Sequence, residues 1–458
     1  MNNRGILIAG THSGCGKTTV SMGLMRAFAR RGYAVQPWKA GPDYLDPKLH
    51  TIAAGRTSRN LDTMLCEPQT VEELYHRQPS DISIVEGVMG LYDGAGAHDE
   101  RGSAAHLSKI LKLPVILVID ARAMARSAAA LIKGFCEFDP EVNVAGVIFN
   151  RVGSRRHSEI LTDAIDHYTD IPVIGSIPKD ETLIMGSRHL GLIPAEDTEI
   201  WNNKFDEIAE ILEEYLDLDM LLRIAEQVRS SELVTQRLPV KGNHHNGKIR
   251  IGIAQDSAFN FYYQDNLDLM EASGAQLISF SPISDKRVPD DLSAIYFGGG
   301  YPELHARELS ENKTMRRSLV DLIESEIPVL AECGGLMYLC NSIETSAERY
   351  PMLGVFDYQA IMNRSLRSLG YCEVDTLHPS IFGDIHSKIK GHVFHWAELD
   401  RVIPKREALF SVKKGERVLN DGLTYKNTLG SWVHFHFASN IHILRSFIQK
   451  AEEYHGRE

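Results

Sequence analysis

Apolar runs alternate with helical patterns through the first half of the chain. The runs are rich in Val and Ile and several are continuously apolar, which is typical of a parallel sheet that helices cover on both faces. They read GILIA, YAVQPWK, ISIVEG, PVILVID, VAGVIFN and PVIGSIP. Helical patterns follow the first run, over residues 20–31, and close this half over about residues 201–228. We therefore predict a first domain of the α/β class with a doubly wound parallel sheet.

A second alternation of the same kind fills the other half. Its apolar runs are IRIGIA, QLISFS, AIYFGGG and IPVLAECGG, and helical patterns cover residues 265–272 and about 310–324. This pattern predicts another doubly wound α/β domain. The segment RLPVKGNHHNGK between the halves is rich in Pro, Gly, Asn and His, as linkers are. We place the first domain at residues 1–236, the linker at 237–248 and the second domain at 249–458.

Length and composition agree with two globular domains and exclude several classes of protein. The chain has 458 residues, of which 43% are hydrophobic and 24% charged, and it lacks a run of 18 apolar residues. The start, MNNRGILIAG, leads into a glycine loop instead of a cleavage site, so we expect a cytoplasmic protein without a membrane partner. The net charge of −12 argues against nucleic-acid binding. Six cysteines without a CxxC pair disfavour a zinc ribbon or a disulfide framework.

The segment GTHSGCGKTT, residues 10–19, directly follows the first apolar run and ends like a phosphate-binding loop. In the common pattern GxxxxGK[ST], backbone N–H groups and a helix N-terminus hold phosphates. The end of the pattern is present, whereas its first glycine position is occupied by Thr11 and Gly10 lies one residue earlier. Because a helical pattern follows the loop, we expect a nucleotide site with unusual spacing.

Each residue of this loop has an expected role toward ATP. Gly14 and Gly16 let the backbone approach the phosphates closely. Lys17 contacts the β and γ phosphates, and Thr18 offers its hydroxyl group to Mg²⁺. Thr19 caps the phosphate cradle.

Polar residues at the ends of later strands are candidates for the rest of the nucleotide and metal site. Asp43 and Glu86 follow the second and third apolar runs, and the carboxyl ends of parallel strands line the ligand crevice of an open sheet. We expect both to bind Mg²⁺ with Thr18, although a turn or capping role is the alternative for each. Lys39 is a candidate cation near the transferred phosphoryl group. Asn150 is a candidate for reading the adenine edge, with simple turn chemistry as the alternative.

A second reactive centre is indicated in the other half. Cys333 follows the strand IPVLAE and precedes GGLMYL, which is the order of a nucleophile elbow, and a helix N-terminus lowers the pKa of a thiol. The N–H group of Gly334 is a candidate oxyanion donor, with the glycines at 298–300 as a second source. The segment GSWVHFHFAS supplies His434 and His436 as candidates for moving the thiol proton. Plain packing of these histidines remains the alternative.

Together these segments closely resemble the cobyrinic acid a,c-diamide synthase family. In chain order they are GTHSGCGKTT, KAGPDYLDP, SRNLDTML, EGVMGLYDG, FNFYYQDNLDLME, GGGYPEL, AECGGLMYL and VHFHFAS. The first domain is similar to the dethiobiotin-synthetase-like P-loop ATPases, in which the longer spacing from Gly10 to Gly16 is normal. The second is similar to the class I glutamine amidotransferases of the CobB/CobQ type, which have a flavodoxin-like α/β fold.

The resemblance implies a reaction and a catalytic dyad. The reaction is the amidation of the a and c acetate carboxylates of cobyrinate, through acyl phosphates formed from MgATP, with L-glutamine as the nitrogen donor, in cobalamin biosynthesis. The wider class I group has a glutamate two residues after the catalytic histidine, and here position 436 is His. The implied dyad is therefore Cys333 and His434, with His436 as the alternative base.

The expected macrocyclic substrate carries several carboxylates, so cations should gather locally on this acidic chain. Arg59, Arg364 and Arg367 are candidates for binding those carboxylates, and Tyr262 and Tyr263 for lying against the ring. Exposed-surface or core positions are the alternative for all five.

Two other functions compete with this interpretation. The same motifs occur in Ni-sirohydrochlorin a,c-diamide synthases of coenzyme F430 biosynthesis, which the sequence does not separate from the cobyrinate enzymes. A nucleotide-switch ATPase of the partitioning type would have an inert C-terminal domain, but its extra lysine would fall at position 12, which is His. The sequence leaves a homodimer open.

Overall fold

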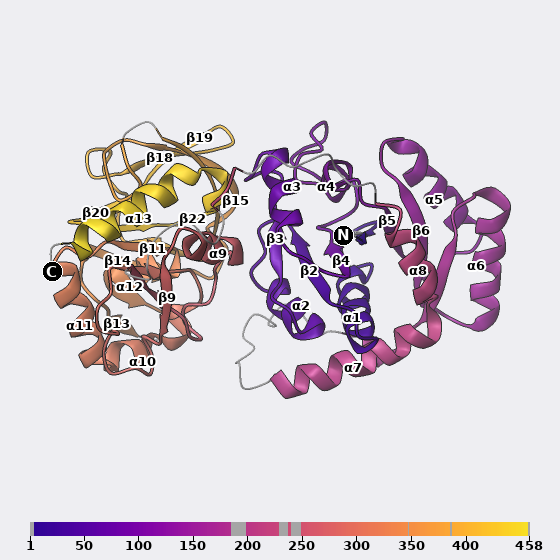
Figure 1. The fold of residues 1–458 in the computed structure, drawn as a ribbon, viewed down its shortest axis with the longest axis horizontal. Helices are drawn as coiled ribbons and strands as arrows, with labels where there is room; N and C mark the ends of the chain where they lie inside the picture. Colours follow the sequence, from indigo (N-terminus) through magenta and orange to yellow (C-terminus); the bar gives the residue numbers. More distant parts are fainter. Residues whose placement is uncertain are drawn as a thin grey trace. The chain divides into compact units, whose positions relative to one another are not determined.

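The structure, a computed structural model, describes residues 4–184, 198–228, 237–239, 249–346, 348–384 and 387–456. The chain divides into two compact units, Met1–Gln236 and Arg237–Glu458 (Figure 1). Of the predicted linker at 237–248, only residues 237–239 are among those described. Within the described ranges, none of the helices is long and apolar enough to cross a membrane.

The first unit is built on a seven-stranded parallel sheet with the strand order β3-β2-β4-β1-β5-β6-β7. Its strands are β1 (Gly5–Gly10), β2 (Val35–Ala40), β3 (Arg59–Leu61), β4 (Ile82–Glu86), β5 (Val115–Asp120), β6 (Val144–Val152) and β7 (Val173–Pro178). All six predicted runs form strands of this sheet, which confirms the predicted fold class. Strand β3 was not predicted because its three residues are too few to show a pattern.

Helices cover both faces of this sheet. They are α1 (Lys17–Arg30), α2 (Asp46–Ala54), α3 (Pro68–His76), α4 (Ala104–Leu111), α5 (Ser127–Phe138), α6 (Arg155–Tyr168), α7 (Thr198–Tyr215) and α8 (Leu218–Ala225), with the 3-10 turn η1 (Glu181–Leu183). Helices α1, α2, α7 and α8 share one apolar core with the sheet, and right-handed crossovers place α3 to α6 on the opposite face. The predicted helix over 201–228 is two helices, because Asp217 Oδ1 accepts the N–H of Met220 and caps the second one.

The second unit contains a six-stranded sheet with the order β20-β21-β11-β10-β8-β9, parallel except for β20. Its strands are β8 (Arg250–Ala254), β9 (Gln276–Phe280), β10 (Ala294–Phe297), β11 (Val329–Glu332), β20 (Leu423–Tyr425) and β21 (Thr428–Ser431). The helical elements of the unit are α9 (Gln264–Ala272), η4 (Pro302–His305), α10 (Ala306–Glu311), α11 (Lys313–Glu324), α12 (Gly334–Leu339), η5 (Phe437–Ser439) and α13 (Ile441–His455). The predicted parallel core of the second domain is thus present.

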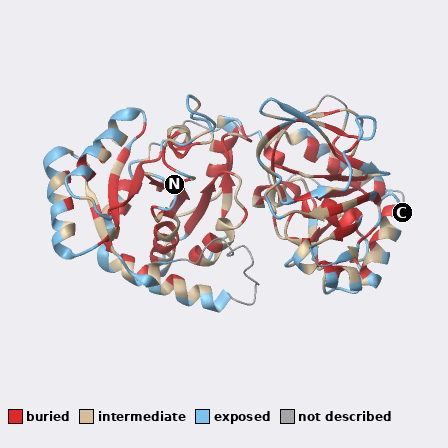
Figure 2. Cartoon of the chain, turned by 180° about the vertical axis from the view of Figure 1, so that it is seen from behind, coloured by how far each residue is buried: buried red, intermediate tan, exposed pale blue. Residues whose placement is uncertain are grey.

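Two further sheets of the second unit were not predicted from the sequence. One has the order β13-β12-β14-β17 and the other β19-β18-β15-β16-β22. Their strands are β12 (Cys340–Glu344), β13 (Arg349–Pro351), β14 (Phe356–Met362), β15 (Ser368–Thr376), β16 (Lys388–His395), β17 (Ala397–Leu399), β18 (Phe410–Lys414), β19 (Arg417–Asp421) and β22 (Val433–Phe435). Several of these strands alternate buried and more exposed residues, so they lack the continuous apolar runs of the parallel strands. Figure 2 shows the parallel strands buried and the outward helix faces exposed.

Candidate active sites

The phosphate loop joins β1 to α1, and its shape depends on glycine. Gly14 and Gly16 have φ angles of 85° and 103°, in the left-handed region that favours glycine. A Cβ atom at Gly16 would lie 2.0 Å from Nδ2 of Asn150, so a side chain there would collide with the end of β6. The loop is therefore bare backbone at both predicted positions, as a phosphate cradle requires.

Asn150 supports this loop from the end of β6. Its buried amide nitrogen donates to the carbonyl oxygen of Cys15 at 2.9 Å, and its amide oxygen accepts the N–H of Arg151 at 2.9 Å. These two bonds use one of its two N–H groups and one of the two lone pairs of its oxygen, and its predicted role in reading adenine stays a prediction. The side chain of Arg151 donates to the carbonyl oxygen of Gly14 at 2.9 Å and pairs with Asp120 at 2.5 Å. Sequence reasoning missed this arginine because no motif marks it.

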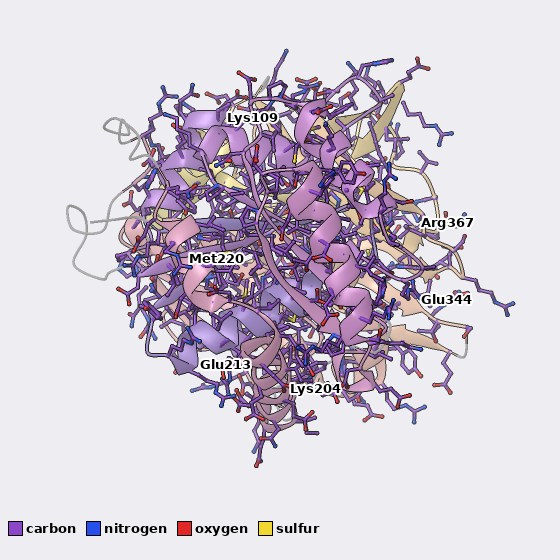
Figure 3. All side chains as sticks on the ribbon, turned by 90° about the vertical axis from the view of Figure 1, so that its right-hand side faces the viewer. Lys109, Lys204, Glu213, Met220, Glu344 and Arg367 are labelled. Atoms are coloured by element: carbon purple, nitrogen blue, oxygen red, sulfur yellow. The ribbon has the colours of Figure 1, made fainter. Side chains whose placement is uncertain are left out.

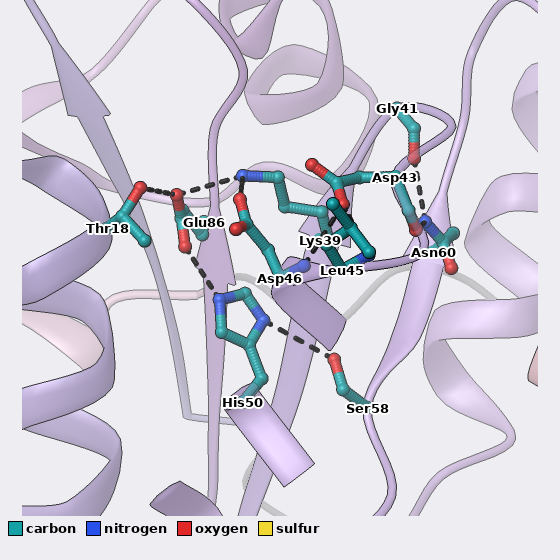
Figure 4. Close-up of polar contacts among 10 residues, drawn as sticks. All are labelled: Thr18, Lys39, Gly41, Asp43, Leu45, Asp46, His50, Ser58, Asn60 and Glu86. Atoms are coloured by element: carbon teal, nitrogen blue, oxygen red, sulfur yellow. Dashed lines mark hydrogen bonds and ion pairs between the residues drawn. The ribbon is translucent and has the colours of Figure 1, made fainter. Parts of the chain in front are cut away.

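Glu86, at the end of β4, lies at the centre of a buried polar cluster (Figure 4). Its Oε1 accepts a hydrogen bond from the hydroxyl group of Thr18 at 2.6 Å and one from Nζ of Lys39 at 2.9 Å. Its Oε2 lies 2.6 Å from Nε2 of His50, and Lys39 also pairs with Asp46 at 2.5 Å. Three predicted residues, from α1, β2 and β4, are thus joined to two from α2 that the sequence did not indicate.

The charges of this cluster stabilise one another. Burial opposes ionisation of Glu86, but Lys39 and the bond from His50 hold the pKa of its carboxyl group well below the usual range. Burial likewise opposes the charge on Lys39, and Glu86 and Asp46 raise the pKa of its amine above the ordinary value. Burial raises the pKa of Asp46, which Lys39 partly offsets. A fully buried carboxylate and a buried ammonium group therefore face each other beside the phosphate loop.

Asp43 caps the start of α2 and also interacts electrostatically with Lys39 of the cluster. Its Oδ1 accepts the backbone N–H groups of Leu45 and Asp46 at 2.8 and 3.0 Å, which fixes the start of α2. Asn60 donates to the carbonyl oxygen of Asp43 at 2.8 Å and holds the turn. The carboxylate is near enough to contribute to the raised pKa of Lys39. The carboxylate therefore lies near the Lys39–Glu86 pair, and its place beside the phosphate loop and its binding of a metal remain predictions.

The two remaining loop residues differ in their surroundings. Lys17 is buried at the first position of α1. The hydroxyl group of Thr19 donates to the carbonyl oxygen of Leu183 at 3.4 Å, away from the loop backbone. This hydrogen bond does not involve the phosphate loop, so the predicted role of Thr19 as a cap of the phosphate cradle stays a prediction.

Cys333 lies at a sharp turn between β11 and α12, as predicted for a nucleophile elbow. Its φ and ψ angles are 48° and −99°, a strained conformation for a residue with a side chain. Its N–H donates to the carbonyl oxygen of Ser431 at 2.7 Å, and its Sγ lies 3.6 Å from the carbonyl oxygen of Phe394. A Cβ atom at Gly334 would lie 3.2 Å from the backbone nitrogen of Gly300. Both predicted sources of oxyanion donors are thus close together at the elbow.

The expectation of a lowered thiol pKa at this elbow is wrong. Burial raises the pKa of the Cys333 thiol above its ordinary value, and the carboxylates of Glu303 and Glu332 add to the increase. The N–H of Gly334 acts in the opposite direction but is outweighed, and α12 has only six residues. The thiol of Cys333 is therefore protonated near neutral pH, so an attack by its sulfur would need a base to accept the proton.

His434 is buried on β22 between a glycine and an acid. A Cβ atom at Gly299 would lie 2.4 Å from Cε1 of His434, so only glycine leaves room for the ring. Nδ1 of His434 lies 3.7 Å from Oε2 of Glu332, the residue before the nucleophile. Burial lowers the pKa of His434 to about 4, so its imidazole is neutral near neutral pH and can act as a base.

His436, the alternative base, faces a different acid. It precedes η5, and its Nε2 lies 3.9 Å from Oδ2 of Asp265. Its ring centroid is 4.9 Å from that of Tyr263, and burial lowers its pKa to about 4 as well. Oε1 of Glu332 accepts the N–H of Phe435, which links the strand of His434 to β11, and the choice of His434 over His436 as the base stays a prediction.

A pocket opens at Cys333. Its lining consists of Phe261, Gly300, Tyr301, Glu303, Cys333, Met337, Met362, Phe394, His395, Trp396 and Ala397. Burial raises the pKa of Glu303 to about 7 and lowers that of His395, which stacks on Trp432, to about 4. Neither Glu303 nor His395 was expected beside Cys333, because their place in this pocket depends on segments brought together by the fold.

The two tyrosines predicted to contact a macrocycle are part of the protein interior. The hydroxyl group of Tyr262 bonds to the carbonyl oxygen of Ala254 and accepts the N–H of Gly298 at 2.8 Å. Tyr263 is 1% exposed. Their neighbour Phe261 lines the thiol pocket instead. These positions support the core alternative for both tyrosines.

The three arginines predicted to bind carboxylates lie in different surroundings. Arg59 donates to the carbonyl oxygen of Thr57 at 2.9 Å, and Arg364 is exposed. Arg367, at the periphery of Figure 3, bonds to Glu398 at 2.9 Å. Their roles toward a substrate remain predictions.

Both units of the chain match families of known proteins. Residues 6–192 match the CobQ/CobB/MinD/ParA nucleotide binding domain family, and residues 250–441 match the CobB/CobQ-like glutamine amidotransferase domain family. The chain is 42% identical to the cobyrinate a,c-diamide synthase of Listeria innocua, over 96% of this chain and 97% of the relative. The relative of that name from Archaeoglobus fulgidus is 41% identical, with 97% of each chain covered. The one from Caldanaerobacter subterraneus is 38% identical, over 99% of this chain and the whole of the relative.

Each of the two matched domains contains one of the two candidate sites. The phosphate loop and the Glu86 cluster fall in the nucleotide-binding match, and the Cys333 elbow falls in the amidotransferase match. Identity of about two residues in five continues over nearly the full length of both chains. The chain therefore belongs to the cobyrinate a,c-diamide synthase family of ligases.

Proposed function

We propose that this chain amidates the a and c acetate carboxylates of cobyrinate, with ATP as the energy source and glutamine as the nitrogen donor. One observation carries the proposal: a phosphate loop bonded to a buried Lys39–Glu86 pair and a cysteine elbow with a buried histidine occur in one chain. The names of its relatives support the choice of cobyrinate.

The first unit has the groups that activating a carboxylate requires. A carboxylate is a poor electrophile toward ammonia, so its oxygen first attacks the γ-phosphorus of ATP, and ADP leaves. Ammonia then attacks the carbonyl carbon of the acyl phosphate, loses a proton and expels phosphate. Lys17 and Lys39 supply positive charge where negative charge builds up on the transferred group. Glu86 holds Lys39 in place from the buried side.

The donor atoms beside the loop suit Mg²⁺. Thr18 offers a hydroxyl oxygen, and Asp43 and Glu86 offer carboxylate oxygens, which are the ligands this hard cation prefers. We infer that these three residues hold it, directly or through water. When bound, the ion would neutralise charge on the β and γ phosphates.

The second unit has the groups for releasing ammonia from glutamine. The thiol of Cys333 transfers its proton to His434 as sulfur attacks the side-chain amide carbon, and the N–H groups of Gly334 and Gly300 stabilise the oxyanion. His434 then gives the proton to the departing ammonia, which leaves a thioester. Water, losing a proton to His434, hydrolyses the thioester, and glutamate and the free thiol result.

The test is a comparison of two variants with two nitrogen sources. Cys333→Ala should fail to amidate cobyrinate with glutamine but retain amidation with ammonium, whereas Lys17→Ala should lose both. Mass spectrometry of the product, with cobyrinate and Ni-sirohydrochlorin offered in parallel, also decides between the two macrocycles. Equal loss with both nitrogen sources in folded Cys333→Ala enzyme would contradict the division of labour, and amidation of Ni-sirohydrochlorin alone would replace the substrate.

A further inference from the structure

A buried glutamate, Glu332, lies beside His434, the histidine of the proposed reaction. It comes before Cys333 in the sequence and not two residues after the histidine. Glu332 is the last residue of β11, and its side chain is 2% exposed beside a His434 side chain that is 1% exposed. The distance from Glu332 Oε2 to His434 Nδ1 is 3.7 Å. The position two residues after His434, where the wider class I group has its acid, is His436.

The placement of Glu332 is fixed by the strand that carries the histidine. Its Oε1 accepts the N–H of Phe435 at 3.1 Å, and Phe435 directly follows His434 in β22. The second carboxylate oxygen is thereby directed toward the imidazole. A distance of 3.7 Å is longer than a hydrogen bond, but bonds of this kind are often long in the absence of substrate and shorten in the reacting complex.

We propose that Glu332 is a positioning residue that orients His434 and stabilises its cationic form when Cys333 gives up its proton. This inference rests on the proposed function, because it takes glutamine hydrolysis as the reaction of the second unit. The acid of the catalytic group then precedes the nucleophile in the chain, instead of following the histidine.

The physical reason is the choice of the protonated ring nitrogen. An ionised Glu332 accepts a hydrogen from Nδ1 and leaves the lone pair of Nε2 to take the thiol proton. A neutral Glu332 would donate to Nδ1 and leave the hydrogen on Nε2, which cannot then act as the base. Ionised Glu332 also compensates the positive charge that forms on the buried His434.

The surroundings of Glu332 make its ionisation dependent on pH. Burial raises its pKa to about 8. The groups that face it are His434 on β22, Tyr296 on β10, the phenol of Tyr262 and the Cys333 thiol, all of which are neutral at neutral pH. Glutamine hydrolysis should therefore increase with pH through this range and reach a plateau when Glu332 is ionised.

The rival explanation is that Glu332 has a structural role as the acceptor for the N–H of Phe435. Glu332→Gln separates the two roles, because glutamine keeps an acceptor oxygen and nearly the same shape but has no charge. Asp265→Asn is the matched control, since Asp265 is a buried acid 3.9 Å from the other histidine of the segment, His436. Glu332→Asp, which keeps the charge on a shorter side chain, is the second variant.

The experiment measures glutamate release by the purified full-length enzymes across pH, together with amidation supported by ammonium and the thermal unfolding temperature. Glu332→Gln should lower kcat for glutamine by about 10²- to 10⁴-fold, with KM changed little, and should lose the increase with pH. Ammonium-dependent amidation should be unchanged. Asp265→Asn should stay within about threefold of wild type, and Glu332→Asp should keep about a tenth of the activity or more.

Several results would overturn the inference. A Glu332→Gln enzyme with wild-type kcat and pH profile would leave only the structural role. A loss in Asp265→Asn in place of Glu332→Gln would make His436 the base. An equal loss in Glu332→Gln and Glu332→Asp, with or without a lower unfolding temperature, would show that packing and not charge is decisive. If wild type hydrolyses glutamine but leaves cobyrinate unamidated, the proposed function fails while this inference can still be tested.

Discussion

Replacing Lys39 with methionine should destabilise the first unit strongly at neutral pH. Nζ of Lys39 lies 2.9 Å from Oε1 of Glu86, whose side chain has no exposed surface, and 2.5 Å from Oδ2 of Asp46. Removing one partner of a buried ion pair costs about 3–5 kcal/mol, because the other charge stays buried without compensation. The bonds from His50 and Thr18 to Glu86 remain, so the lower end, about 3 kcal/mol, is expected.

Hydrogen–deuterium exchange followed by mass spectrometry measures this loss within one unit. Amides of β1, β2 and β4 should exchange about 150-fold faster in Lys39→Met, since 1.36 kcal/mol corresponds to a factor of ten. Peptides from the second unit serve as the internal control. Adding Glu86→Gln to Lys39→Met should restore part of the protection, because the uncompensated charge is then removed.

The loss should also depend on pH. Because Lys39 lowers the pKa of Glu86 in the folded state, the pair contributes stability that is complete above the unfolded carboxyl value of about 4.3 and is lost as pH falls below it. The exchange rates of the first unit in wild type and in Lys39→Met should therefore become similar in acid. Less than about a tenfold change in exchange at neutral pH, or a double variant less protected than Lys39→Met, would refute the reasoning.

Three further predictions follow from the two sites. Gly16→Ala should weaken ATP binding by at least about tenfold in calorimetry, because its Cβ would lie 2.0 Å from Nδ2 of Asn150; wild-type affinity would show that the loop can adjust. Gly299→Ala should lower glutamine hydrolysis by about 10² or more and spare ammonium-dependent amidation, because its Cβ would displace the His434 ring; equal losses would point to misfolding. Iodoacetamide should modify Cys333 more slowly than free cysteine at neutral pH, because burial raises the pKa of its thiol; faster modification measured by peptide mapping would contradict this.

The parallel strands were predictable because burial on both faces demands continuous apolar residues. In β5 and β11 every residue is buried, and both strands were recognised from their composition alone. Strand β15 has exposed and buried residues in mixed order, and β3 has three residues, so neither carries a comparable pattern. Sequence patterns therefore indicated the two parallel cores and left out the two further sheets of the second unit.

Candidate site residues could be chosen from the sequence where a local motif contains them, whereas the residues that contact them in the fold could not. Thr18, in the first turn of α1, and Cys333, just before α12, both lie next to glycines of a local sequence motif. His50 contacts Glu86 although the two are 36 positions apart in the chain. Glu332 lies near His434 because the fold brings their two strands together. The raised thiol pKa was missed for the same reason, since burial is a property of the folded unit.

The reaction proposed here makes an acyl phosphate, so the oxygen that the substrate loses must end in phosphate. Cobyrinate labelled with ¹⁸O in its carboxylates should, with ATP and glutamine, release inorganic phosphate that carries one ¹⁸O atom for each amide formed. Mass spectrometry of the phosphate reads this ratio. Amide formation with unlabelled phosphate, or phosphate release without any amide, would contradict the coupling of the two sites.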